Sequence, residues 1–194
     1  MDNRIKAVSF DEKQHKYWYN GKELFGVTTA IGKMLGKHFP DNDTVMLATL
    51  YGKDVHKEVE NYYNKDIPVS SEGAKWVLEE LDRYIQTCML DPVKKIECEV
   101  MVSDFEGTAS KVDVVAHHEN GKVTLFDIKT TAKFDREYCS LQLSVYKVLY
   151  EQCYGEEVMN MFVLGTKSKR SFRILYQQGS KVNKVLCANR EKTI

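Results

Sequence analysis

Two segments rich in valine, leucine and isoleucine, near residues 109–118 and 122–130, most constrain the fold of this chain. Asn120-Gly121 lies between them, and an Asn-Gly pair between apolar runs is typical of a tight turn that joins two antiparallel strands. The sequence therefore predicts two hydrogen-bonded neighbours inside a sheet.

Each of these predicted strands carries an acid among its apolar residues. Asp127 and Lys129 alternate with Phe126 and Ile128, so both polar side chains emerge on one face of a strand. Asp113 and Asp127 stand at comparable distances from the turn, which allows both carboxylates to converge on one ion if the register permits.

Phosphodiester hydrolysis needs hard oxygen ligands for a divalent cation, an activated water and positive charge beside the phosphate. Asp113, Asp127 and the backbone carbonyl of Ile128 are suited to hold the ion, and Lys129 is suited to orient or deprotonate the water. The alternative is that the acids face solvent on an edge strand, with Lys129 as their salt-bridge partner.

A third carboxylate is expected from the preceding strand, near residues 94–103. Glu99 lies in an alternating segment there and can reach the metal directly or through water. In a regular strand Glu97 shares its face, so Glu97 is the competing candidate, and either acid can simply be solvated.

A helix is predicted after the lysine, with Asp135 as its N-cap. Gln142 and Tyr146 are four residues apart and share one face of this helix. Beside an acid-and-lysine strand they are candidate site residues. The alternative is that Tyr146 is a core aromatic residue and Gln142 a polar residue at the core boundary.

His56 lies in an earlier segment with the apolar stripe of a helix. A lone histidine on a charged helix is usually a surface residue. A neutral imidazole can instead add a nitrogen ligand to an oxygen-rich site, which suits Mn²⁺ as well as Mg²⁺.

Together these motifs resemble the PD-(D/E)XK nuclease superfamily, within it the histidine-containing branch with the RecB-type nuclease domain, phage recombination exonucleases and the mitochondrial genome maintenance exonuclease. The similarity spans nearly the whole chain. Its motifs, in the family's order, are His15-x-Tyr17 through Val27-Thr28-Thr29, Gly52-x-x-x-His56, Glu99, Asp113, Asp127-Ile128-Lys129 and Gln142-x-x-x-Tyr146.

The resemblance implies a site of catalytic and metal-binding groups with Mg²⁺ or Mn²⁺ as cofactor. The implied catalytic residues are Lys129, Asp113, Asp127, Glu99, Gln142 and Tyr146. The implied metal ligands are His56, Glu99, Asp113, Asp127 and the Ile128 carbonyl.

The chain departs from the family pattern in two places. Members often carry glycine three residues before the first metal aspartate, where this chain has Ser110, with Gly107 displaced upstream. Some relatives hold an iron–sulfur cluster through clustered cysteines, whereas the five cysteines here lie far apart without C-x-x-C spacing. We therefore expect no iron–sulfur cluster.

The 194 residues, 43% of them hydrophobic, are enough for one core, so we expect a single nuclease domain over 1–194. Residues 1–92 would form an N-terminal hairpin and helical part with the histidine motif, and 93–178 the catalytic core. The odd number of cysteines, the absence of an apolar leader and the lack of a long apolar run predict a cytoplasmic protein, bacterial or in a phage-infected host, with no membrane partner.

Basic and acidic residues balance at 28 each, although nucleic-acid-binding proteins are often basic overall. Local clustering of cations matters more than net charge for binding phosphates. Any single cluster is more often an ordinary solvated face. Three clusters stand out: Lys167, Lys169, Arg170 and Arg173; Lys33, Lys37 and His38; Lys129, Lys133 and Arg136.

The remaining pattern predicts an α/β fold, a restriction-endonuclease-like mixed sheet flanked by helices, with an N-terminal β-hairpin and helices. Asn20-Gly21 predicts a type I′ hairpin turn, Thr28 or Thr29 a helix cap, Pro40 and Asp41 a break, and Ser70 or Ser71 another cap. Later strands are expected over 158–165 and 171–177, with a short helix in the tail.

The function expected is a divalent-metal-dependent DNA nuclease and, by resemblance, an exonuclease acting in replication, recombination or repair. Single-stranded DNA or duplex ends would be its substrate, with a homo-oligomer or a replication or recombination protein as further partner. The alternative is an inactive nuclease-fold module that binds nucleic acid or such a partner, motivated by Ser110 and the neutral charge. A structural or small-molecule-binding α/β domain is a third interpretation.

Overall fold

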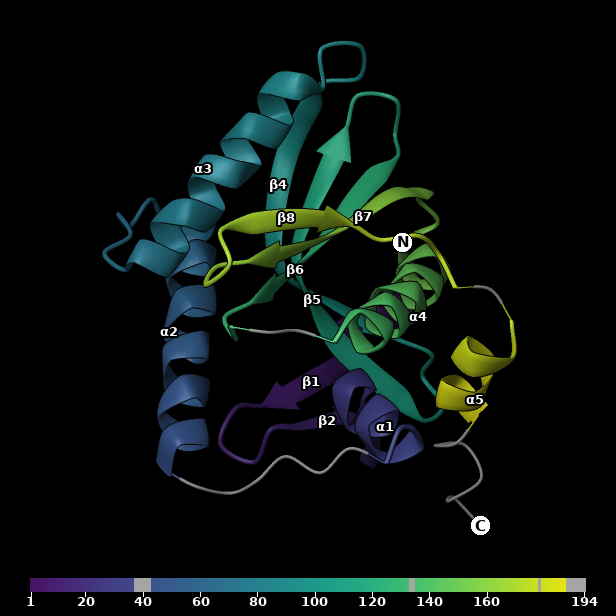
Figure 1. Cartoon of the computed structure of the whole chain (residues 1–194). Helices are drawn as coiled ribbons and strands as arrows, with labels where there is room; N and C mark the ends of the chain where they lie inside the picture. Colours follow the sequence, from purple (N-terminus) through teal and green to yellow (C-terminus); the bar gives the residue numbers. More distant parts are fainter. Residues whose placement is uncertain (37–42, 133–134, 178, 188–194) are drawn as a thin grey trace.

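A computed structural model describes residues 1–36, 43–132, 135–177 and 179–187. Groups of strands and groups of helices follow one another along the chain (Figure 1). The elements are η1 (Asn3–Ala7), β1 (Val8–Asp11), β2 (Lys16–Tyr19), β3 (Lys22–Gly26), α1 (Val27–Met34), α2 (Asp43–Lys65), α3 (Glu72–Thr87), β4 (Val93–Ser103), β5 (Thr108–His118), β6 (Val123–Lys129), α4 (Arg136–Tyr154), β7 (Val158–Gly165), β8 (Arg170–Arg173) and α5 (Ser180–Cys187).

One mixed sheet organises the molecule, in the order β1-β2-β3-β5-β6-β7-β8, with β4 paired to β5 outside this path. The β3–β5 and β6–β7 pairs are parallel and the other pairs are antiparallel. The predicted α/β class, a mixed sheet flanked by helices as in a restriction-endonuclease-like core, is thus confirmed.

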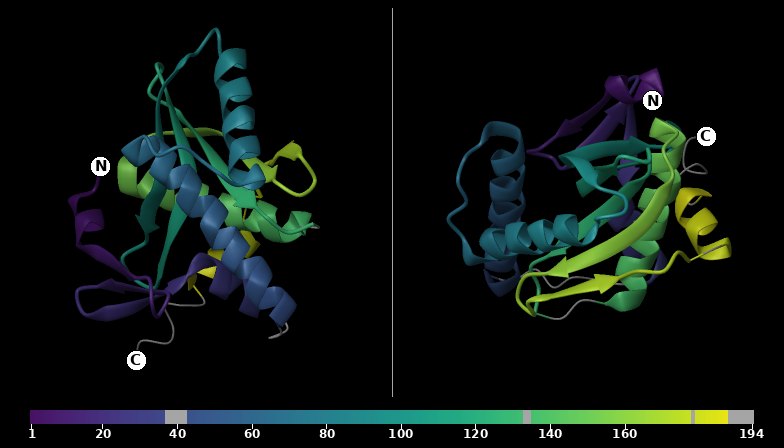
Figure 2. Two further views of the ribbon diagram at one scale, coloured as in Figure 1. Left: turned by 90° about the vertical axis from the view of Figure 1, so that its left-hand side faces the viewer. Right: turned by 90° about the horizontal axis from the view of Figure 1, so that it is seen from above.

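Helices cover both faces of the central sheet (Figure 2). On one face, α2 and α3 pack apolar residues such as Val55 and Leu81 against Phe126 and Leu164. On the other face, α1, α4 and α5 enclose a larger core, of which Val145 is a fully buried member. Burial on both faces explains why the central strands are continuously apolar in sequence.

The Asn20-Gly21 turn is a type I′ hairpin turn, as predicted, because both residues have positive φ, 49° and 78°. A further strand, β1, pairs with β2 and was not expected from the sequence. The predicted threonine cap of the first helix is wrong: the N-cap is Gly26, without a side-chain hydrogen bond.

The later elements follow the sequence closely. Ser71 caps α3 by accepting from the Ala74 N–H, and Asp135 caps α4 by accepting from the Tyr138 N–H. The strand expected over 171–177 is shorter, since β8 ends at Arg173, and the tail forms α5. The predictions for Lys37, His38, Pro40, Asp41 and Lys133 fall outside the described residues.

Strand β5 pairs with β4 along one edge and with two different strands along its other edge. Thr108 and Ala109 pair with β3 at one end of this edge, and Val114 to His117 pair with β6 at the other. Residues 110–113 lie between them without a strand partner on that edge in the described part of the chain. The sheet is therefore split where Asp113 lies. No helix within the described ranges is both long and apolar enough to cross a bilayer.

Candidate metal centre

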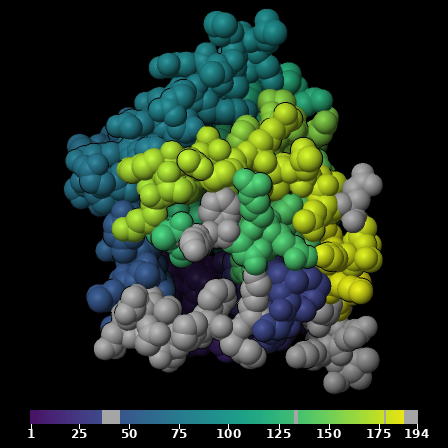
Figure 3. All heavy atoms as spheres, in the orientation of Figure 1, coloured from purple at the N-terminus to yellow at the C-terminus, as the bar shows by residue number. Residues whose placement is uncertain are grey.

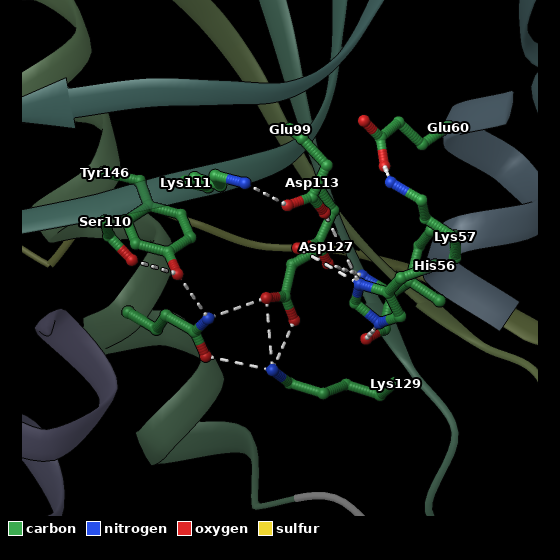
Figure 4. A network of polar contacts seen from close by, with 12 residues as sticks. His56, Lys57, Glu60, Glu99, Ser110, Lys111, Asp113, Asp127, Lys129 and Tyr146 are labelled. Carbon is green, nitrogen blue, oxygen red and sulfur yellow. Dashed lines mark hydrogen bonds and ion pairs between the residues drawn. The ribbon is translucent and has the colours of Figure 1, made fainter. Parts of the chain in front are cut away.

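At the split in the sheet, the Asp113 side chain replaces a backbone hydrogen bond. The ladder between β5 and β6 ends at the Val114–Phe126 pair. Beyond it, the Ile128 N–H donates to Asp113 Oδ2 at 2.6 Å. Asp113 therefore joins the two strands while its other carboxylate oxygen remains available to neighbouring groups (Figure 4).

Helix α2 brings His56 to this carboxylate, because Val55 and Val59 anchor the helix in the core. One turn earlier, Gly52 allows a close approach to β6: a Cβ there would lie 2.9 Å from Thr130 Oγ1. His56 Nδ1 lies 3.5 Å from Asp113 Oδ1, and its Nε2 lies 3.2 Å from the Ile128 carbonyl oxygen. The helical glycine-and-histidine motif thus meets the end of β6.

Glu99 reaches the same place because β4 is irregular there. Its φ of 55° lies in the left-handed region, which reverses the usual alternation of side chains. Glu99 Oε1 lies 3.9 Å from His56 Nδ1, and Oε2 lies 3.5 Å from Lys111 Nζ. The strand expected to place Glu97 and Glu99 on one face is therefore not regular.

Glu97 belongs to a different group of side chains. It accepts from His117 at 2.9 Å and pairs with Lys95. It lines a cavity of about 540 Å³ with His117 and Tyr154. His56, Glu99 and Asp113 do not line this cavity, so Glu99 rather than Glu97 is the acid of β4 that meets His56 and Asp113.

His56, Glu99 and Asp113 form a group that can hold a metal ion. One ligand atom from each lies within 4.8 Å of the others. Their side chains are partly buried, with exposed fractions of 29%, 24% and 12%. One imidazole nitrogen and two carboxylates suit Mn²⁺ and Mg²⁺, the latter chiefly through oxygen.

The charges in this group are strongly coupled. Burial lowers the pKa of His56, but the Asp113 and Glu99 carboxylates more than offset this effect and raise it to about 10. Burial raises the pKa of Asp113, yet the His56 cation and Lys129 bring it below its ordinary value. The two carboxylates therefore favour the protonated form of the imidazole, and the imidazolium in turn favours the ionised form of Asp113.

Asp127 lies on the other side of the split and faces α4. Its carboxylate is 1% exposed and lies 2.8 and 3.1 Å from Lys129 Nζ. Oδ2 has this ion pair but no hydrogen bond of good geometry, whereas Oδ1 accepts from Gln142 Nε2 at 2.7 Å. Asp127 is thus close to the metal group without being one of its three members.

Burial raises the pKa of Asp127 to about 6, although Lys129 opposes this shift. Burial lowers the pKa of Lys129, but the Asp127 and Asp113 charges more than compensate and raise it. The neighbouring acids therefore stabilise the charged form of Lys129, which favours its role as a cation over a role as a base.

A chain of hydrogen bonds in the core orients Lys129. Gln142 Oε1 accepts from Lys129 at 3.0 Å, and Gln142 Nε2 also donates to the Tyr146 hydroxyl at 2.9 Å. Ser110 Oγ lies 3.1 Å from the same hydroxyl. The sequence analysis treated Ser110 only as a departure from glycine. The alternation of side chains along β5 places Ser110 on the face toward α4, and this pattern could have predicted its contact with Tyr146.

The predicted site residues therefore gather at one end of β6 in two connected groups. The metal group contains His56, Glu99 and Asp113, with the Ile128 carbonyl beside the imidazole. The second group contains Asp127, Lys129, Gln142 and Tyr146. Figure 3 shows a hollow between α2, in blue, and α4, in green, with the N-terminal segment in purple at its floor.

No family model matches this chain, and no curated protein matches its sequence. Among solved structures, it is similar to a candidate exonuclease from Eubacterium rectale, with 12% identity and a TM-score of 0.38 over 87% of this chain and 77% of the other. It is also similar to a protein named SSO0001, with 14% identity and a TM-score of 0.34 over 84% and 81% of the two chains. Similarities at this level carry no argument about function.

Proposed function

We propose that this protein is a divalent-metal-dependent nuclease that hydrolyses phosphodiester bonds. The observation that carries the proposal is the meeting of His56, Glu99 and Asp113 beside the ion pair of Asp127 and Lys129. A metal group next to a fixed cation matches the needs of phosphodiester hydrolysis, in which negative charge accumulates on the phosphate.

The residues present fit a divalent cation. Asp113, Glu99 and His56 would hold it, and the Ile128 carbonyl and the Asp127 carboxylate are the nearest further oxygen donors. The buried Oδ2 of Asp127 is ion-paired with Lys129 but accepts no hydrogen bond. A buried oxygen of this kind is suited to accept a further ligand. When bound, such an ion supplies Lewis acidity toward the phosphate and lowers the pKa of water.

The protein's own groups then have defined tasks. Lys129 places a cation beside the phosphate, where its charge stabilises the developing negative charge. Gln142 holds the ammonium group and the Asp127 carboxylate in one orientation. Tyr146 and Ser110 hold Gln142 from behind, so these two act as positioning residues rather than as groups that touch the substrate.

Within this proposal, DNA is the substrate and exonucleolytic cleavage of single strands or duplex ends is the mode of action. Support comes from the order of the sequence motifs, which resemble the histidine-containing branch of the PD-(D/E)XK nucleases. The same resemblance favours a role in replication, recombination or repair, together with an oligomer or a partner protein.

The test is digestion of circular duplex, linear duplex and end-labelled single-stranded DNA with Mg²⁺ or Mn²⁺. Wild type should degrade linear DNA, spare circles and stop when the cation is chelated. Lys129→Met should remain folded and lose at least about 100-fold in rate, a typical effect of removing one charge-stabilising group. Equal digestion by the two proteins would refute the role of Lys129. DNA binding without any cleavage would instead support the inactive module.

A further inference from the structure

The turn between β7 and β8, together with β8 itself, carries four cations that the proposed chemistry does not use: Lys167, Lys169, Arg170 and Arg173. All four are exposed. Among the residues that the structure describes, no carboxylate forms an ion pair with them. Cations left without acidic partners on a surface create a local positive potential that attracts polyanions.

This turn is attached to the candidate site. Strand β7 runs parallel to β6, and the last register pair joins Lys129 to Gly165. The Thr166 N–H then donates to the Lys129 carbonyl at 2.9 Å. The turn therefore begins directly beside the lysine that the proposed function places at the phosphate.

Arg170 lies in the same cross-strand row as Lys129. Gly165 pairs with Lys129 on one side and with Arg170 on the other, so the row reads lysine, glycine, arginine. Two strand spacings separate the outer backbones by about 10 Å. Glycine between them puts no side chain in the way.

The side chain of Arg170 belongs to the α4 face of the sheet, as that of Lys129 does. Phe172, two residues on, lies under the Arg136 guanidinium of α4 at 5.2 Å, and residues two apart in a strand share a face. Ser171 points the other way, to Glu80 of α3. Arg170 and Lys129 therefore face the same side of the sheet.

Lys167 borders the site from the opposite side. Its ammonium group lies 4.6 Å from the centre of the Tyr51 ring on α2, next to Gly52. Lys169 is held farther out, against Trp76 and the Glu72 carbonyl of α3. In Figure 1 the turn lies beside the junction of α2 and α3. Cations thus flank the site on both faces of the sheet.

We infer that Arg170 and Lys167 bind the phosphates that flank the cleaved one, so that the β7–β8 turn is a backbone-binding element for a nucleic-acid strand. The inference rests on the proposed function for the position of the cleaved phosphate. It adds the binding element and the class of ligand, a phosphodiester chain. Arg170 suits bidentate contact with a phosphate, whereas Lys167 acts as a point charge.

Binding without cleavage tests this inference apart from the nuclease activity. The probe is fluorescein-labelled single-stranded oligothymidylate in EDTA, and anisotropy gives Kd over a series of salt concentrations. Wild type is compared with Arg170→Ala, Lys167→Ala and the double variant. Lys94→Ala is the matched control, because Lys94 is an exposed cation of β4 at the other end of the sheet.

Each contact removed should lower the slope of log Kd against log salt by about 0.7 and weaken binding about five-fold at ~0.1 M salt. Lys94→Ala should behave as wild type, and Arg170→Lys should restore most of the slope. Equal slopes for wild type and the double variant would overturn the inference even if the protein cuts DNA. Lost slope in a protein that never cuts would support the turn as a backbone-binding element and reject the nuclease. Failure of wild type to bind would also overturn it.

Discussion

Tyr146→Phe removes a hydroxyl group on which the orientation of Gln142 depends. This hydroxyl accepts from Gln142 Nε2 at 2.9 Å and lies 3.1 Å from Ser110 Oγ (Figure 4). Tyr146 is 3% exposed, so water cannot readily replace the lost partner. Gln142 keeps its bond to Asp127, but it and Ser110 each lose the Tyr146 hydroxyl as a partner. We therefore expect a loss of about 1–3 kcal/mol in the free energy of unfolding.

The Ser110→Ala variant separates the two partners in a double-mutant cycle. Alone it removes one bond and should cost about 0.5–1.5 kcal/mol. Combined with Tyr146→Phe, it should cost less than the sum, because Ser110 no longer leaves a hydroxyl unpaired. The expected coupling energy is about 0.5–1.5 kcal/mol, measured by urea unfolding.

Activity provides the second measurement. Tyr146→Phe should lower kcat on labelled DNA while leaving KM nearly unchanged, because the loosened Gln142 no longer fixes Lys129. Tyr154→Phe is the control. Tyr154 lies on the same helix but away from the site, and its hydroxyl donates to the Met101 carbonyl at 2.8 Å. Two results would refute the role of these hydrogen bonds in orienting Lys129. One is strict additivity of the stability losses in Tyr146→Phe and Ser110→Ala, and the other is an equal loss of kcat in the Tyr146 and Tyr154 variants.

Three other changes test separate parts of the structure. Gly52→Ala brings a Cβ to 2.9 Å from Thr130 Oγ1 and should cost about 1–3 kcal/mol by thermal unfolding; Thr130→Ala should relieve it, and equal costs in both backgrounds would contradict the close approach. Burial raises the pKa of Glu58, but hydrogen bonds from Ser71 and Ser70 more than offset this effect and bring the pKa below its ordinary value of 4.5. Glu58→Gln should therefore cost about 1–2 kcal/mol of stability above pH 4.5. The difference in stability between wild type and variant should vanish as the pH falls through the folded pKa. A difference that grows in acid would refute this. Mn²⁺ at 100 times its Kd should stabilise wild type by about 2.7 kcal/mol in a thermal-shift assay. Asp113→Asn keeps an acceptor for the Ile128 N–H and should lose this stabilisation by Mn²⁺. Equal stabilisation of the variant would show that Asp113 is not a metal ligand.

The backbone elements were largely predictable because local signals agreed with burial. The apolar runs of β5 and β6, the Asn120-Gly121 turn and the Asp135 cap each act over a few residues, and each is confirmed. β1 escaped prediction because its four residues, Val8–Asp11, are too short for a clear alternation, and its pairing depends on β2. At Gly26, the backbone entering from β3 determines the start of α1 more than the threonine side chains do.

The sequence predicted which residues would lie near one another at the end of β6 but not how they are arranged. Period-two alternation predicted that Glu97 and Glu99 share a face, and the positive φ of Glu99 breaks this pattern. No pattern of residue types encodes a left-handed glutamate, because tertiary contacts with His56 and Lys111 accompany that conformation. Ser110 was likewise visible only as an exception until Tyr146 appeared beside it.

Stability alone gives little reason for the charges at the split in the sheet. A single acceptor for the Ile128 N–H could come from a neutral side chain, yet Asp113 lies there with Glu99 and Asp127 near the same point. Bringing carboxylates together out of water is costly unless cations compensate them. Lys129 and Lys111 each meet one acid, which leaves the proton on His56 to balance the third. A divalent cation bound by the same imidazole and carboxylates would supply a stronger charge than that proton, and this balance of charges supports the proposed metal binding.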